Sequence, residues 1–396
     1  MTTSYRTVPA VLLFTCLMAG TVIGAEGEAK DYIPTIMAGS LDGVPPDSPA
    51  DRVDPNVPES LFGGVVSLRV GGNSVCSGVA ISPYHILTAA HCFDIDADGI
   101  NDRGTDVDIN VNLHGDLSTV YDPQFIRRVD INPDFTGFNN PSLGDDLAVV
   151  SLYWPLPDDV PTYGLYRGTP QTGDELTLVG YGRSGRGDVG YSFPSSHTVK
   201  RVGSNVVDVI LPDDEGSGRP EVWEYDFDGP EGNGSMGGPT LGNDIETTIG
   251  PGDSGGPGFI NIEDELQVYS INTFTIGSIG NFGTEGGGIL VSSYLDWLDP
   301  FLQYLDPIPG DINWDGVVND ADLTIFLPTW GGVMGEPGYS AGSDINRDGV
   351  IGQKDLGLLL ANFGQGRSRM VPAPPTVFIT TFCLAGMTGR RRKYTL

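Results

Sequence analysis

Ser254 lies in a segment whose composition suits a nucleophile. It stands in Gly252-Asp253-Ser254-Gly255-Gly256-Pro257. Glycines adopt backbone angles that residues with a Cβ resist, so main-chain N–H groups can gather near the seryl oxygen, where an oxyanion would form. A serine hydroxyl alone is a weak nucleophile, so this chemistry also needs a base and an acid that orients the base.

Two other motifs supply the base and the acid. His91 stands in Thr88-Ala89-Ala90-His91-Cys92, and Asp146 directly precedes the apolar run Leu147–Val150. The order His91, Asp146, Ser254, with roughly 50 to 110 residues between neighbours, resembles that of the chymotrypsin-like serine proteases. The resemblance spans roughly residues 53 to 305 and implies hydrolysis of peptide bonds.

This resemblance implies a role for each residue. Ser254 would be the nucleophile and His91 the general base and then the general acid, with Asp146 orienting His91. The N–H groups of Gly252 and Ser254 would form the oxyanion hole. No cofactor is needed for this chemistry.

The same resemblance locates the primary specificity pocket and an activation cleavage. Thr248, six residues before Ser254, matches the pocket residue, and its lack of charge speaks against a preference for Lys or Arg. Family members are cut before a β-branched residue, and the new amine pairs with the acid that precedes the serine. Counting back from the first strand predicts cleavage between Arg52 and Val53, so that the amine of Val53 would pair with Asp253.

Short, turn-bounded apolar runs must position these residues. Glycine is abundant at 57 residues and proline at 30, which favours an all-β body. The resemblance implies two six-stranded β-barrels and a C-terminal helix over residues 294–305, with the active site between the barrels. Strands are expected at residues 65–70, 76–82, 86–90, 107–113, 147–152, 176–180, 199–209, 222–227, 257–262 and 267–275.

The net charge of −31 argues against nucleic acid as a partner, because phosphate binding needs clustered Lys and Arg. An acidic chain is suited to binding cations, and the acidity also keeps a secreted protein soluble. The composition therefore excludes one partner class and leaves a role for metal ions open.

The first residues predict export. Arg6 is a basic flank, residues 8–23 are mostly apolar, and Ala25 suits cleavage, so residues 1–25 resemble a secretory signal peptide. Residues 26–52 are polar and would be a propeptide or linker, before a protease domain at 53–305. We therefore expect a secreted or cell-surface protein.

Export permits a disulfide bond. The resemblance implies that Cys76 and Cys92 form the bond that closes the histidine loop. A loop of about 15 residues gains about 3 kcal/mol from such closure in the chain-entropy model. The alternative is two buried free thiols.

A linker at residues 306–309 leads to two copies of one acidic pattern, thirty-three residues apart. Oxygen ligands at positions 1, 3, 5, 7 and 12, with glycine at position 6, describe an EF-hand type of calcium loop. Each loop precedes an apolar helix (323–327 and 356–360), so residues 310–366 resemble a type I dockerin, a small α-helical domain of paired calcium loops. The predicted Ca²⁺ ligands are Asp311, Asn313, Asp315, Val317 and Asp322, then Asp344, Asn346, Asp348, Val350 and Asp355.

A third acidic run directly follows His91-Cys92. Its candidate calcium ligands are Asp94, Asp96, Asp98, Ile100 and Asp102. Thr105 occupies position 12, and no helix is evident after it. Calcium here would brace the loop that carries the base; the alternative is a solvated acidic loop.

Residues 367–396 resemble a PEP-CTERM sorting tail. A proline motif, a mostly apolar stretch at 376–387 and the basic cluster Arg390–Lys393 follow one another. The basic cluster suits a cytoplasmic retention signal, and the alternative is a disordered basic tail. Contact with a membrane or cell surface is expected only through this tail.

Three hypotheses follow. The first is a secreted serine endopeptidase that acts on proteins or peptides and carries a calcium-binding dockerin-like module, for which a cohesin-like receptor is one candidate partner. The second is a catalytically idle protease fold that serves as a calcium-dependent binding or adhesion protein. The third is an esterase with the same three residues. An intact Ser-His-Asp set favours the first, because a chain released from catalysis does not need all three side chains.

Overall fold

The computed structural model describes residues 36–137, 144–230, 232, 234–237, 240–277, 279–303 and 307–366. The predicted signal peptide and sorting tail lie outside the described residues. No helix among the described residues has the length and apolar character that a membrane crossing requires.

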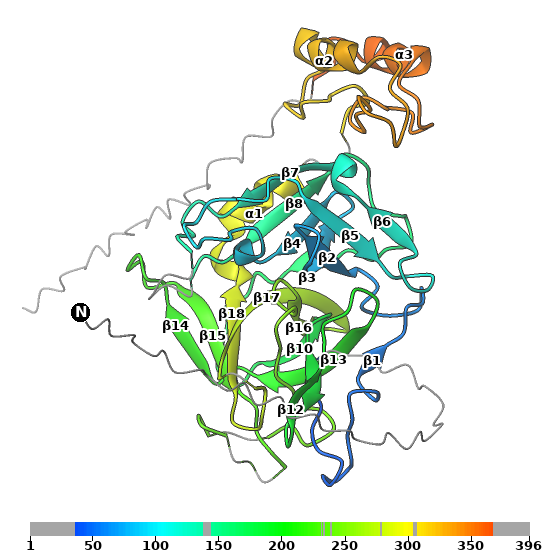
Figure 1. The fold of residues 1–396 in the computed structure, drawn as a ribbon. Coiled ribbons are helices and arrows are strands. Elements are labelled where there is room, and N and C mark those ends of the chain that lie inside the picture. The colour runs from blue at the N-terminus through cyan, green and yellow to red at the C-terminus, as the bar shows by residue number, and fades with distance from the viewer. Residues whose placement is uncertain are drawn as a thin grey trace, which may run out of the picture. The chain divides into compact units, whose positions relative to one another are not determined.

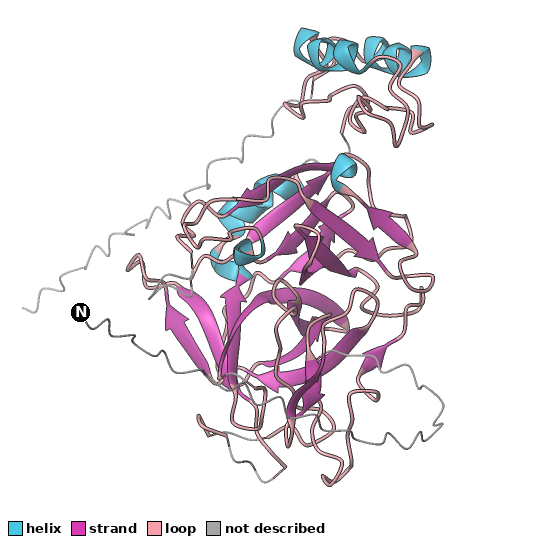
Figure 2. Cartoon of the chain, in the orientation of Figure 1, coloured by secondary structure: helices cyan, strands magenta, loops and turns pink. Residues whose placement is uncertain are grey.

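Two curved sheets dominate the described part of the chain (Figures 1 and 2). The first has seven described strands in the order β6-β5-β2-β3-β4-β8-β7, all antiparallel. Their bounds are β2 (Val65–Val70), β3 (Ser74–Ser82), β4 (His85–Thr88), β5 (Val107–Val111), β6 (Thr119–Tyr121), β7 (Ile126–Ile131) and β8 (Ala148–Leu152).

The second sheet has nine described strands in the order β1-β13-β10-β16-β17-β18-β15-β14, with β9 pairing parallel to β17. Their bounds are β1 (Val53–Asp54), β9 (Gly164–Leu165), β10 (Glu175–Gly180), β13 (Lys200–Val206), β14 (Val209–Pro212), β15 (Pro220–Asp226), β16 (Pro257–Ile262), β17 (Glu265–Ile276) and β18 (Glu285–Leu290). A separate hairpin joins β11 (Ser184–Arg186) and β12 (Gly190–Phe193).

The helical elements are short. The 3-10 turns are η1 (Ala90–Cys92), η2 (Pro123–Phe125), η3 (Val291–Ser293) and η4 (Leu327–Thr329), and the α-helices are α1 (Leu295–Leu302), α2 (Asp320–Phe326) and α3 (Gln353–Ala361). Helix α1 confirms the helix expected over residues 294–305, with a later start and an earlier end.

The mostly β fold agrees with the predicted class, but the strand count differs. Over the described residues the sheets have seven and nine strands in place of six each. Some of the additional strands are too short for an alternating pattern to be visible: β1 and β9 have two residues each. The Gly-rich β18 was missed because glycine has a low β propensity.

The register of β4 and β8 explains how His91 and Asp146 meet. Thr88 at the end of β4 pairs with Ala148 at the start of β8. Antiparallel pairing puts the exit of one strand beside the entry of the other. His91, just after β4, and Asp146, just before β8, therefore lie at the same end of the sheet.

Burial of apolar strand residues supports this frame. Val66, Leu68 and Val79 on β2 and β3, and Val149 on β8, are fully buried in one cluster. That cluster continues into the second sheet through Phe259. A continuous core of this kind fixes the strands on which the site residues depend.

Residues 310–366 form two loop–helix units with their own small core. Ile312, Val318, Phe326, Ile351 and Leu359 are buried together. Both helices start three residues before the predicted apolar runs, because Asp322 and Asp355 each accept the N–H of the residue that precedes the helix, at 2.9 and 2.8 Å.

Candidate active site

His91 and Asp146 form a two-point hydrogen-bonded pair. Asp146 Oδ1 accepts the backbone N–H of His91 at 2.8 Å, and Oδ2 lies 2.7 Å from His91 Nδ1. Asp146 is fully buried, whereas 21% of the His91 side chain is exposed. This arrangement fixes the imidazole ring and turns its Nε2 edge away from Asp146, as a base needs.

Ser254 lies on a tight loop just before β16. Gly252 and Gly255 flank it with φ values of 106° and 84°, a left-handed region that favours glycine. The carbonyl oxygen of Ser254 accepts the N–H of Ser77 at 2.8 Å and lies 4.0 Å from Cys92 Sγ. Since Cys92 follows His91, the structure brings Ser254 beside the histidine turn.

Two N–H groups of this loop have no hydrogen-bond acceptor among the described residues. They belong to Gly252 and Ser254, whereas the N–H groups of Asp253, Gly255 and Gly256 are all paired with backbone carbonyls. Unpaired backbone donors beside a nucleophile are available for a negatively charged oxygen. These are the two donors that the sequence predicts for the oxyanion hole.

The comparison with known families decides the classification. The family model described as Trypsin matches residues 56–298, which include His91, Asp146 and Ser254. The chain belongs to the trypsin family of serine proteases. The match covers more than half of the chain and agrees with the mostly β architecture of the two sheets.

The predicted disulfide is confirmed. Cys76 on β3 and Cys92 on η1 are bonded to each other, so the two thiols are not free. The bond ties the histidine turn of the trypsin-family domain to a central strand of the first sheet.

Asp253, which precedes Ser254, is fully buried. Its carboxylate accepts the N–H groups of Gly182 at 2.7 Å and Gly250 at 2.8 Å. Burial raises the pKa of Asp253 to about 7, while these hydrogen bonds and the positive charge of Arg201 lower it. The loop of Ser254 is thus anchored through backbone groups.

Arg52 and Val53 occupy positions that argue against the predicted activation cleavage. Arg52 is 6% exposed, and its guanidinium pairs with Asp47 at 2.7 Å and with the carbonyl of Ile245 at 2.6 Å. Val53 pairs with Arg201 in β1. The peptide bond between Arg52 and Val53 is therefore poorly accessible to a protease, because the Arg52 side chain is buried and Val53 is paired in a strand.

A segment that the sequence assigned to the propeptide lies buried instead. Ile36 and Met37 are fully buried; the Ile36 carbonyl accepts the Ser184 hydroxyl at 2.6 Å, and the Met37 N–H donates to the Thr248 carbonyl at 3.1 Å. Residues from Ile36 onward are therefore part of the folded domain, and its boundary lies before residue 53.

The space beside Thr248, the predicted pocket residue, is filled by aromatic side chains. Thr248 is fully buried, and its hydroxyl lies 3.4 Å from that of Tyr225. A Cβ at Gly286 would lie 2.5 Å from the Tyr225 ring, and one at Gly287 would lie 2.5 Å from the Phe274 ring. The glycines of β18 make room for these rings and do not leave the pocket open.

Ser77 is a site residue that the sequence analysis missed. Besides donating its N–H to Ser254, it donates its hydroxyl to the Gly252 carbonyl at 2.9 Å and accepts the Tyr181 N–H at 3.0 Å. A serine inside an apolar strand carries no pattern that points to this role. Only the proximity of Cys76 hinted that β3 approaches the site.

Three acidic loops share one hydrogen-bond pattern. In each, the carboxylate of the first residue accepts the N–H groups of the fifth and sixth, and the fourth residue has a φ near 60°. The first residues are Asp94, Asp311 and Asp344, and the fourth residues are Ala97, Trp314 and Arg347.

The loops differ in how they close. In the C-terminal pair, Asp322 accepts the Ile312 N–H at 2.7 Å and Asp355 accepts the Asn346 N–H at 3.0 Å. In the loop after His91, Asp102 accepts the Ile95 N–H at 2.8 Å, so closure comes at position 9 and not at position 12. Oxygen atoms of Asp94, Asp96 and Asp102 lie within 4.8 Å of one another, which suits a hard cation.

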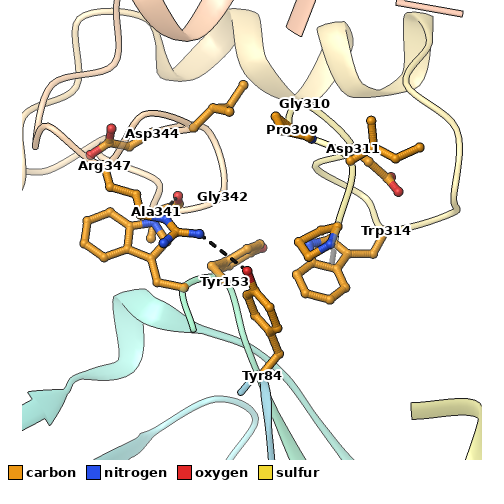
Figure 3. Close-up of a pocket in the computed structure, with 14 residues that line it drawn as sticks. Tyr84, Tyr153, Pro309, Gly310, Asp311, Trp314, Ala341, Gly342, Asp344 and Arg347 are labelled. Atoms are coloured by element: carbon orange, nitrogen blue, oxygen red, sulfur yellow. Dashed lines mark hydrogen bonds between the residues drawn. The ribbon is translucent and has the colours of Figure 1, made fainter. Parts of the chain in front are cut away.

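The C-terminal loops also contact the first sheet. Trp314 meets Tyr84 edge to face at 5.3 Å between ring centroids, and the Arg127 guanidinium lies 4.5 Å from the Trp314 ring. Arg347 Nη2 lies 3.4 Å from the Tyr84 hydroxyl, a contact that Figure 3 marks with a dashed line. Both residues line a cavity of about 100 Å³. The fourth residues of both loops thus approach one tyrosine.

Proposed function

We propose that this trypsin-family protein is a secreted serine endopeptidase that uses Ser254, His91 and Asp146. The observation that carries the proposal is the two-point His91–Asp146 pair beside a loop with two unpaired N–H groups. The rival hypotheses, an idle binding protein and an esterase, lack a specific observation in their favour.

The reaction would proceed through an acyl-enzyme. Ser254 Oγ bonds to the peptide carbonyl carbon while its proton passes to His91 Nε2, and Asp146 stabilises the resulting cation. The N–H groups of Gly252 and Ser254 bind the oxyanion. The C–N bond then breaks as His91 returns the proton to the leaving amine.

Deacylation repeats these steps with water. His91 takes a proton from the water, whose oxygen bonds to the acyl carbon. The ester bond to Ser254 breaks, and the serine oxygen recovers a proton from His91. Proteins or peptides are the substrates that the family implies. The aromatic rings beside buried, uncharged Thr248 speak against a preference for Lys or Arg.

The test is cleavage of a defined peptide pool by the processed protein, with products identified by mass spectrometry. Ser254→Ala should lower the rate by at least about a thousandfold. Ser74→Ala, an exposed serine at the start of β3, is the matched control. Equal cleavage by Ser254→Ala and the control would contradict the proposal, and ester hydrolysis without peptide products would favour the esterase.

We further propose that activation, if it produces an amine near Asp253, occurs close to Ile36. Buried contacts of Ile36 and Met37 with Ser184 and Thr248 support this position, whereas burial of Arg52 opposes cleavage after that residue. N-terminal sequencing of active protein decides between a chain that begins near residue 36 and one that begins at Val53.

Calcium is proposed for the C-terminal loops and for the loop after His91. The donor sets consist of oxygen atoms, which suits Ca²⁺. Asp311, Asn313, Asp315, Val317 and Asp322 would hold one ion, and Asp344, Asn346, Asp348, Val350 and Asp355 another. Asp94, Asp96, Asp98, Ile100 and Asp102 would hold a third. Bound ions would neutralise the clustered carboxylates.

A dockerin-like role in attachment or assembly is proposed for residues 310–366, with a cohesin-like receptor as one candidate partner. Calcium titration by calorimetry tests the loops, because Asp311→Asn and Asp344→Asn should each remove about one site. Glu336→Gln, a change at an exposed residue outside both calcium loops, should leave the number of sites unchanged. A full number of sites in either Asn variant would contradict the ligand assignment.

Export and surface sorting are proposed from residues 1–25 and 367–396. Mass spectrometry of the protein recovered from culture medium or cell surface would give both mature ends. Retention of residues 1–25 or of the whole tail would contradict the corresponding proposal.

A further inference from the structure

The turn before Asp146 is held by residues of the other half of the domain. Asp145 has a φ of 59°, a left-handed conformation that residues with a Cβ rarely adopt. Such a conformation persists when surrounding contacts hold it. Because Asp145 directly precedes Asp146, whatever holds this residue also sets the direction of the carboxylate that binds His91.

Glu221 and Tyr294 provide these contacts. The Asp145 N–H donates to Glu221 Oε1 at 2.9 Å and lies 3.1 Å from Tyr294 Oη. Tyr294 Oη is also 2.9 Å from Asp145 Oδ1 and in hydrogen-bond contact with Glu221 Oε1. Glu221 belongs to β15 and Tyr294 lies between η3 and α1, so the cluster of Asp145, Glu221 and Tyr294 joins the first sheet to the second.

The cluster of Asp145, Glu221 and Tyr294 has fewer hydrogen-bond donors than its contacts require, and an extra proton on a carboxyl group would supply the missing donor. Tyr294 has one hydroxyl hydrogen but lies within hydrogen-bond distance of two carboxyl groups. Two ionised carboxylates offer only acceptors. A proton on Asp145 or Glu221 makes both contacts with Tyr294 attractive.

The surroundings favour such a proton. Asp145 is 3% and Glu221 2% exposed. Burial raises the pKa of Asp145 to about 7; the hydrogen bond from Tyr294 opposes this rise, and the negative charges of Glu221, Glu215 and Asp134 add to it. Burial also raises the pKa of Glu221.

The other charged groups that face the cluster are mostly acidic. Asp213 and Asp214, in the β14–β15 loop, act on Glu221. A cavity of about 270 Å³ adjoins the cluster, and Arg219 and Asp296 are charged residues of its lining. Negative neighbours make a proton harder to lose.

We propose that Glu221 and Tyr294 are positioning residues for peptide hydrolysis, and that a proton shared with Asp145 holds the turn that carries Asp146. This inference rests on the proposed peptidase function. Loss of the proton leaves two repelling carboxylates with one hydrogen between them, so Asp146 loses part of its alignment with His91. Activity should therefore fall as pH rises through this ionisation, opposite to the rise that deprotonation of a His91 base produces.

Infrared difference spectroscopy across this pH range tests the shared proton without any reaction. Wild-type protein should show a carboxylic acid carbonyl band that disappears as pH rises through about 7. Because buried Asp253 and Glu246 also have pKa values of about 7, part of this absorption remains in every variant. The component due to the cluster should be missing from Asp145→Asn and from Glu221→Gln, and the whole band should persist in Asp296→Asn, an exposed acid beside the same cavity. Persistence of the whole band in both cluster variants would overturn the shared proton.

Steady-state kinetics test the positioning role. Tyr294→Phe keeps the ring and removes the hydroxyl, so kcat should fall about tenfold with little change in KM, and the alkaline fall in activity should shift or vanish. Tyr166→Phe removes the hydroxyl of a half-exposed tyrosine that is not part of the cluster; it is the control and should match the wild type. Glu221→Gln provides a second, isosteric variant if Tyr294→Phe does not fold.

The outcomes separate this inference from the proposed function. Variant profiles that superimpose on the wild type would overturn the positioning role while leaving the peptidase proposal intact. Absence of peptide cleavage by the wild type, with the infrared band present, would contradict the peptidase function and the positioning role but not the shared proton.

Discussion

Two turns of the active site have the same local pattern but are held in different ways. Gly144-Asp145 precedes Asp146, and Gly252-Asp253 precedes Ser254. In both turns a buried aspartate stands directly before the proposed catalytic residue, and burial raises the pKa of that aspartate to about 7. The contacts of each aspartate thus fix the position of the proposed catalytic residue that follows it.

The partners of these two aspartates differ. The carboxylate of Asp253 binds the backbone N–H groups of Gly182 and Gly250, whereas Asp145 meets the side chains of Glu221 and Tyr294. Backbone donors cannot change protonation state, but carboxyl partners can. We therefore expect steric changes to have their larger effect at the serine turn. Both turns should respond to pH, the aspartate turn more strongly because the pKa values of Asp145 and of its partner Glu221 are both raised.

Among the changes that compare the two turns, Gly182→Ala should have the largest effect on activity. A Cβ at Gly182 would lie 2.4 Å from the Asp253 N atom and 2.5 Å from Asp253 Cγ, inside a fully buried site. Because neither backbone can move freely there, the Ser254 turn must shift, and a shift near 1 Å costs about a hundredfold in rate. The measurement is kcat/KM for a peptide substrate.

Gly164→Ala is the control for this change, since a Cβ at Gly164 meets nothing within 4 Å. If Gly182→Ala kept full activity, the serine turn would be more adaptable than this account holds.

A smaller effect is expected from Gly144→Ala. Its Cβ would lie 2.4 Å from Glu221 Oε1, which is the end of a side chain and can move. We expect about a tenfold loss of kcat/KM, most of it from weaker alignment of Asp146. A loss of kcat/KM as large as that of Gly182→Ala would contradict the expectation that the turn held by side chains adapts more easily than the turn held by backbone groups.

Metal removal tests whether a calcium ion stabilises the acidic loop after His91. The loop after His91 is joined to the histidine turn through the Asp102 N–H, which donates to the Phe93 carbonyl. Without a cation its carboxylates repel, so chelation should lower the activity of a version lacking residues 306–396 by severalfold. Unchanged activity after chelation would exclude a calcium brace in this loop.

The smallest effect is expected from Asp253→Asn, which should change how the stability of the folded protein depends on pH. The pKa of Asp253 is raised in the folded state, so its contribution to stability is fully present below its usual pKa near 4 and is lost as pH rises through about 7. The difference in melting temperature between wild type and Asp253→Asn should therefore change across this range, as calorimetry can show. Parallel curves would contradict the assigned shift.

The Cys76–Cys92 bond was predicted from the sequence and is confirmed. Short contiguous motifs were also enough to propose His91, Asp146 and Ser254 as catalytic residues. The strand register that joins them is also encoded locally, since apolar runs lead into His91 and out of Asp146. These features need no knowledge of distant contacts.

Features that depend on distant segments were missed or misplaced. Glu221 and Tyr294 contact Asp145 across 76 and 149 residues of sequence, and neither has a motif. The rings of Tyr225 and Phe274, which fill the space beside the β18 glycines, belong to β15 and β17, so the β18 sequence alone does not show that this space is occupied. The boundary expected at Val53 leaves out the buried Ile36 and Met37, because their partners Ser184 and Thr248 are distant in sequence and no local pattern indicates these contacts.

Labelling with a serine-directed fluorophosphonate tests the central claim most directly. After processing to its mature end, wild-type protein should gain one label, and peptide mass spectrometry should locate it on Ser254. His91→Ala should react far more slowly, because its serine has lost the base. A wild-type protein that remains unlabelled, or that carries the label on another residue, would contradict the account of Ser254 as an activated nucleophile.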